Sequence, residues 1–115
     1  MSVHYKKHLS EPWYTLVSLG IKTAEGRLFK KDFAEMKPGD TITWFNDDFN
    51  HRECTVKIIG ITKYKSFENY LRKETLKRCL PGMKTMNDGL SVYYKYFTKE
   101  QASTLGVICI HMQVL

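Results

Sequence analysis

The feature that most constrains the fold is an apolar run that changes its alternation in the middle. Val56 and Ile58 occupy one register, whereas Ile59 and Ile61 occupy the opposite one, and the change falls beside Gly60. Side chains alternate between the two faces of a strand, so a change of register indicates a bulge or a sharp bend. Strands that turn the corner of a barrel need such a bend, and the run therefore favours a small β-barrel over a flat sheet.

Periodicity and turn residues predict the remaining elements. We expect strands at 2–8, 22–29, 41–45, 53–61 and 107–112, and helices at 10–19, 66–80, 85–97 and 98–105. Ser10, Ser66 and Thr98 are suitable helix N-caps, and Gly20 and Gly106 are suitable C-terminal stops. The last strand is apolar at almost every position, which is typical of a central strand buried on both faces.

Composition and charge narrow the class of protein. A chain of 115 residues with 43% hydrophobic residues is one domain, 1–115, that can build a core without a disulfide or metal. The net charge of +6 favours an anionic partner such as nucleic acid or a nucleotide. Because neither a signal peptide nor a run of membrane-spanning length is evident, we expect a soluble intracellular protein of the cytoplasm or nucleus, with no membrane partner.

The cysteines and histidines do not form a familiar metal-binding pattern. The cysteines, at positions 54, 79 and 109, are widely spaced, and so are the histidines, at 4, 8, 51 and 111. They contain no CxxC pair and no zinc-finger spacing. The sequence therefore predicts buried thiols in a reducing compartment, with no metal and no cofactor.

The stretch from Gly20 to Arg27 concentrates charge beside two glycines. On a regular strand Thr23, Glu25 and Arg27 would point together, and Lys22 would point the other way. Only a turn at the start of the strand could bring Lys22 to the same pocket. The plain alternative is a solvated strand with a surface ion pair, which contributes little to stability.

Gly20-x-Lys22-x-x-Glu25-x-Arg27 resembles the signature of the ASCH family, a branch of the PUA-like superfamily. Further segments follow the order of the family over nearly the whole chain: Ser10-Glu11-Pro12-Trp13, Lys37-Pro38-Gly39-Asp40, Tyr64-Lys65-Ser66-Phe67 and Leu105-Gly106-Val107. The resemblance implies an α+β, PUA-like fold: a small mixed β-barrel of about five or six strands with peripheral helices.

The resemblance also implies a domain that binds RNA or a nucleotide in a basic cleft. Lys22 and Arg27 would engage phosphate, and Glu25 would accept a hydrogen bond from a base amine or a ribose hydroxyl. Trp13 or Tyr64 could stack a base, although the preferred interpretation of Trp13 is a core residue that fastens its helix to the sheet. The predicted ligand-binding residues are Trp13, Gly20, Lys22, Thr23, Glu25, Arg27, Tyr64 and Lys65.

A second function class is a small hydrolase, and whether the chain is an enzyme stays open at this stage. Some compact bacterial ASCH proteins are amidohydrolases of acetylated cytidine that use a lysine, a nearby threonine and a glutamate. Lys22 matches the lysine, but Glu25 occupies the threonine position. An enzyme acting on such a nucleoside or on RNA would use Lys22 and Glu25 for acid–base catalysis. We rank this class second and a protein-interaction domain third, and we expect a monomer with no specific protein partner predicted.

Overall fold

The longest strand, β4 (Arg52–Tyr64), bends where its alternation changes. Its pairing with β5 (Val107–Val114) shifts register between Ile58 and Gly60. A bulge increases the local twist of a strand, so the sheet curls into a half-barrel. This computed structural model describes residues 1–115, which form an α+β structure of five strands and six helices. The predicted class, a small mixed β structure with peripheral helices, is confirmed.

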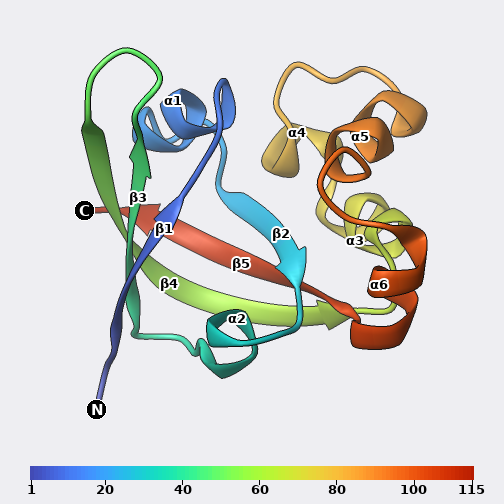
Figure 1. Ribbon diagram of the computed structural model, residues 1–115, viewed down its shortest axis with the longest axis horizontal. Coiled ribbons are helices and arrows are strands. Elements are labelled where there is room, and N and C mark those ends of the chain that lie inside the picture. Colours follow the sequence, from blue (N-terminus) through green and yellow to red (C-terminus); the bar gives the residue numbers. More distant parts are fainter.

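The five strands form one mixed sheet in the order β1-β3-β4-β5-β2. Strands β1 (His4–His8) and β3 (Thr41–Asn46) pair in parallel, and every other pair is antiparallel. The two edge strands are therefore β1 and β2 (Ala24–Leu28). The curl of the sheet brings these edges close together (Figure 1), and Arg27 of β2 donates from Nη2 to the His8 carbonyl of β1 at 3.1 Å.

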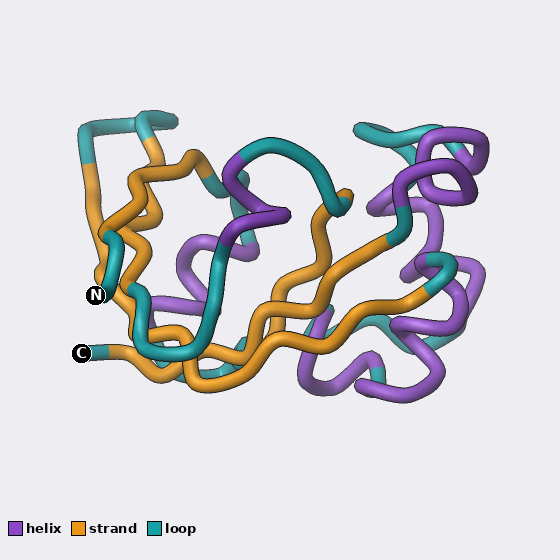
Figure 2. Tube along the Cα trace, turned by 90° about the horizontal axis from the view of Figure 1, so that it is seen from below, coloured by secondary structure: helices purple, strands orange, loops and turns teal.

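The helices divide into two groups. Helix α1 (Trp13–Ser18) connects the two edge strands, and α2 (Asp32–Glu35) leads from β2 to β3. The other four lie between β4 and β5 in the chain and gather at one end of the sheet (Figures 1 and 2): α3 (Phe67–Glu74), α4 (Leu76–Cys79), α5 (Met86–Tyr93) and α6 (Lys99–Leu105). None of the six combines the length and the apolar character that crossing a membrane requires.

Most of the predicted helix boundaries are confirmed by hydrogen bonds. The Ser66 hydroxyl accepts from the Asn69 N–H at 3.0 Å at the start of α3. Thr98 and Gln101 form a capping box at α6, in which each side chain accepts from the other residue's backbone N–H. Gly20 and Gly106 end their helices with φ values of 75° and 83°, a region in which a side chain would be strained.

Ser10 is not the N-cap of α1, and this prediction is wrong. The helix begins after Pro12, which itself occupies the cap position without a capping side chain. The Glu11 carboxylate instead accepts from the Thr15 N–H at 2.9 Å, a role that the sequence pattern did not indicate.

The core forms around β5, whose residues 107–110 are all buried. Trp44 from β3 and the aromatic rings of α3, Phe67 and Tyr70, are fully buried against it. Two of the three thiols, Cys79 and Cys109, are buried as the sequence predicted, whereas Cys54 is only half-buried. The core therefore joins the sheet to the helical end of the molecule.

Replacing Thr98 with alanine tests the capping box. The substitution removes the acceptor for the Gln101 N–H, so the free energy of unfolding should fall by about 0.5–2 kcal/mol. Thr104→Ala, at an exposed position of the same helix, should change it by less than about 0.5 kcal/mol. Urea denaturation measures both variants, and equal losses would contradict a specific capping role.

Candidate functional site

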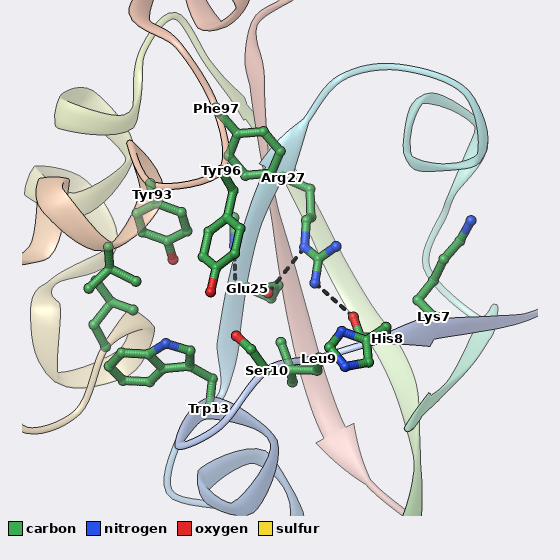
Figure 3. A pocket seen from close by; sticks show the side chains of 13 residues that line it. Lys7, His8, Leu9, Ser10, Trp13, Glu25, Arg27, Tyr93, Tyr96 and Phe97 are labelled. Carbon is green, nitrogen blue, oxygen red and sulfur yellow. Dashed lines mark hydrogen bonds and ion pairs between the residues drawn. The ribbon is translucent and has the colours of Figure 1, made fainter. Parts of the chain in front are cut away.

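A pocket of about 330 Å³ lies between the two edge strands and the C-terminal end of α5. Figure 3 shows Tyr93, Tyr96 and Phe97 on one side, Trp13 and Ser10 on the other, and Arg27 and His8 beside Glu25. Four large aromatic side chains thus contribute to the walls, and Glu25 and Arg27 of β2 bring opposite charges to the pocket.

Lys22 lies beneath this pocket and is almost completely buried, with an exposed fraction of 1%. Strand β2 begins only at Ala24, so Lys22 precedes the regular alternation, and its ammonium group can turn toward Glu25. Its Nζ atom donates to the carbonyls of Ala24 and Cys79 and lies 3.2 Å from Glu25 Oε1. An ammonium group has three N–H donors. All three have partners within the protein, so Lys22 ties the Cys79 carbonyl at the end of α4 to the start of β2 and fixes the Glu25 carboxylate.

Glu25 is the polar centre of the site, and its side chain is only 7% exposed. Its Oε1 atom accepts from the Gly26 N–H at 3.1 Å in addition to Lys22, and its Oε2 atom accepts from Arg27 Nε at 3.2 Å. Burial alone would raise the pKa of this carboxyl group, but the charges of Lys22 and Arg27 outweigh burial and hold the pKa below its usual value. The group is therefore a carboxylate at neutral pH.

Arg27 connects this carboxylate to the opposite edge of the sheet. Its guanidinium carbon lies 5.2 Å from the ring centroids of both Phe33 and Trp44, which fix its orientation. Two of its five N–H donors are used, one by Glu25 and one by the His8 carbonyl. Three donors remain for a ligand or for water.

Gly26 allows an aromatic ring to pack directly on β2. A Cβ atom at Gly26 would lie 2.6 Å from atoms of the Tyr70 ring, closer than packed side chains tolerate. The Tyr70 and Tyr93 hydroxyl groups are 2.8 Å apart, so this close packing also places Tyr93 in the pocket wall. Burial, aided by the Glu25 carboxylate, raises the pKa of Tyr93 well above its usual value, and its hydroxyl stays protonated.

The remaining aromatic residues differ in their exposure. Trp13 is 7% exposed, and its ring lies 5.9 Å from Lys22 Nζ, so it is both a core residue and part of the pocket wall. Tyr96 is 62% exposed at the rim. Phe97 stacks on Phe67 with centroids 5.5 Å apart, which anchors the rim segment to α3. The pocket thus has one exposed ring at its mouth, that of Tyr96, and buried or half-buried rings inside.

Several residues predicted for the site lie elsewhere. Thr23 is exposed and does not line the pocket, because regular alternation begins one residue after it. Gly20 ends α1 outside the pocket. Tyr64 and Lys65 lie in a separate groove beside α6, and the Tyr64 hydroxyl donates to Glu74. Trp13, Glu25 and Arg27 are the predicted residues that line the pocket, with Lys22 directly beneath.

Sequence reasoning missed the rim of the site. The residues added by the structure are Lys7, His8, Leu9, Ser10, Gly26, Leu80, Val92, Tyr93, Tyr96 and Phe97. The available signal is the dense aromatic run from Tyr93 to Phe97, which the sequence pattern places in a helix over 85–97. Only Tyr93 of this run is buried, because α5 ends there and the following residues leave the helix.

Comparisons with known proteins agree with this architecture. Residues 8–114 match the family model of the ASCH domain. The crystal structure of the hypothetical protein PH0355 is 31% identical, with a TM-score of 0.88, over 97% of this chain and 99% of that one. The solution structure of protein PF0455 from Pyrococcus furiosus is also 31% identical, with a TM-score of 0.79 and 97% of each chain covered.

A more distant likeness concerns the fold alone. The crystal structure of an ASCH domain from Lactobacillus crispatus has 15% identity and a TM-score of 0.68, over 98% of this chain and 79% of that one. A search of the curated proteins found no match.

Replacing Gly26 with alanine tests the close packing of Tyr70 on β2. The added methyl group would overlap the ring, so the free energy of unfolding should fall by about 1–3 kcal/mol. Thr23→Ala, an exposed change in the same segment, is the control. An unchanged midpoint of chemical denaturation for Gly26→Ala would show that the ring moves aside without cost.

Because of the ion pairs of Glu25, the free energy of unfolding should decrease at acidic pH. Its pKa is lower in the folded protein than in the unfolded chain, where it is about 4.3, so it stabilises the fold above that pH. This stabilisation is lost as the pH falls through the folded-state pKa. The stability difference between the wild type and Glu25→Gln should therefore be constant near neutral pH and shrink below about pH 4. Denaturation at a series of pH values measures it, and a constant difference at every pH would contradict the ion-pair account.

Proposed function

Because the chain belongs to the ASCH domain family, we propose that it binds single-stranded RNA and takes one unstacked base into the pocket between β1 and β2. Single-stranded RNA is generally recognised through bases that stack on aromatic side chains and hydrogen-bond through their edges. The observation that carries the proposal is an ionised carboxylate, Glu25, with an open acceptor position in a pocket walled by aromatic rings.

The Glu25 carboxylate has one hydrogen-bond acceptor position that no protein group occupies. Each carboxylate oxygen has two lone pairs. Those of Oε1 are used by Lys22 and the Gly26 N–H, whereas Oε2 receives only Arg27 Nε. One acceptor position on Oε2 is free for an amino or imino N–H of a base. A hydrogen bond to a carboxylate is about twice as strong as one between neutral groups.

Arg27 supplies the complementary donor beside this acceptor. Its three unused N–H groups can donate to a base carbonyl, a ring nitrogen or a phosphate oxygen. A carboxylate acceptor next to a guanidinium donor matches the donor–acceptor pairs along the edges of nucleobases. The Phe33 and Trp44 rings hold the Arg27 guanidinium in place beside the carboxylate before a ligand binds.

The rim and the net charge favour RNA over a free nucleotide. Tyr96 is exposed at the mouth, where it can stack on a base that enters the pocket or on its neighbour. Lys7 also lines the pocket, and the whole chain carries a net charge of +6, which attracts a phosphate backbone. A mononucleotide would use the pocket without the benefit of that longer electrostatic contact.

No observation favours the hydrolase alternative. Lys22 has no exposed side-chain surface, and its three donors have partners within the protein, so it cannot exchange protons with a substrate without breaking the core. The comparisons name no hydrolase. Glu25 alone does not define a reaction, and we therefore assign it the role of a hydrogen-bond acceptor.

Replacing Tyr96 with alanine tests base stacking at the rim. The free energy of binding to a short labelled single-stranded RNA should become less favourable by about 1–3 kcal/mol. Fluorescence anisotropy measures this affinity. Phe49→Ala is the matched control, because Phe49 is an aromatic residue with 93% exposure that lies outside the pocket. Wild-type affinity should also fall with rising salt, since phosphate contacts release counterions.

Three results would contradict the proposal. Equal affinities of Tyr96→Ala and Phe49→Ala would place RNA away from the pocket. Competition by a mononucleotide as strong as that by the RNA would indicate a nucleotide-binding protein instead. Turnover of acetylated cytidine that requires Glu25 would show that the domain is an enzyme.

A further inference from the structure

A second polar cluster lies outside the pocket, where α3 covers β4 and β5. Glu74 at the end of α3 and Cys109 and His111 of β5 each direct one possible metal-ligating atom to a common point. These three atoms lie within 4.8 Å of one another. None of the three residues lines the pocket assigned to RNA.

The strand register explains why the cluster forms. Cys109 and His111 are two residues apart on β5 and therefore share a face. Thr62 and Gly60 lie opposite them on β4, so the bulge at Gly60 adjoins His111. A Cβ atom at Gly60 would come within 3.2 Å of the His111 ring. The absence of a side chain there leaves room for the imidazole.

The separation of the His111 and Glu74 ligand atoms matches that in a tetrahedral metal site. Zinc–ligand bonds of 2.0–2.3 Å place neighbouring ligand atoms about 3.3–3.8 Å apart. The His111 Nε2 and Glu74 Oε2 atoms are 3.5 Å apart. The Tyr64 hydroxyl donates to this same carboxylate and orients it, as outer-shell groups do around metal ligands.

The thiol of Cys109 is the third candidate ligand of the cluster. Cys109 has no exposed surface, and its side chain makes no hydrogen bond, although it faces a carboxylate and an imidazole. The combination of one sulfur, one nitrogen and one oxygen is a ligand set that zinc accepts.

We propose that Glu74, Cys109 and His111 form a binding site for Zn²⁺, with a fourth position open to water. A carboxylate and a thiolate balance the charge of the ion, and the thiol releases its proton to solvent when it binds. Mg²⁺ and Ca²⁺ are disfavoured because they require oxygen ligands. The His111 side chain is 26% exposed, which provides a path for entry. The sequence predicted no zinc because the spacing of the cysteines and histidines along the chain matches no zinc motif, whereas this site would form between residues that are distant in the sequence.

Cobalt spectroscopy of the chelator-treated protein tests the thiolate ligand directly. Co²⁺ in the site should produce a thiolate-to-cobalt absorption band in the near ultraviolet, and one equivalent of Zn²⁺ should displace it. Cys109→Ser should abolish the band. Cys54→Ser, which changes a half-buried cysteine outside the cluster, should retain it. A band that persists in Cys109→Ser, or no band in the wild type, would overturn the proposal.

Calorimetric titration with Zn²⁺ provides the second measurement, which remains decisive if Cys109→Ser does not fold. His111→Gln should weaken Zn²⁺ binding by about tenfold or more, whereas His51→Gln, in the β3–β4 loop, should bind as the wild type does. Zn²⁺ should raise the melting temperature of the wild type but not of His111→Gln. Equal affinities of the two histidine variants would show that the cluster is only a hydrogen-bonded network of Tyr64, Glu74 and His111.

Discussion

The arrangement of the site depends on a buried chain of charges in which Glu25 lies between Lys22 and Arg27. Isolated buried charges are costly, and pairing with full hydrogen bonding is what makes them tolerable. Lys22 meets this condition by donating to the Cys79 carbonyl as well as to Glu25, which ties α4 to β2. Arg27 meets it by donating to His8, which ties β2 to β1. The same interactions that satisfy the charges therefore hold the pocket walls together.

The two faces of the curled sheet carry different groups of residues. Glu25 and Arg27 alternate with Gly26 along β2, so the charges and the close contact with Tyr70 fall on opposite faces. The neighbouring strand β5 places Cys109 and His111 toward α3. Both candidate sites thus share a two-strand framework without sharing a side chain, because alternation separates them.

Local signals in the sequence predicted much of the fold. The register change beside Gly60, the cap at Ser66 and the box at Thr98 depend on residues a few positions apart, and all three are present. The Ser10 cap failed because the Glu11 carboxylate reaches the Thr15 N–H instead. The helix begins only after Pro12, two residues beyond Ser10, and the sequence pattern did not indicate that start.

The sequence by itself determined the charged stretch from Lys22 to Arg27, the bend of β4 and the buried strand β5, because each is a local pattern of side chains. Tertiary structure decided which residues meet. Lys22 turned inward to reach the Cys79 carbonyl, 57 residues away, and Tyr64 turned to Glu74 instead of the pocket. These contacts form because a buried polar group is costly unless it finds a partner, and the partners lie on distant segments. No short stretch of sequence contains both members of such a pair.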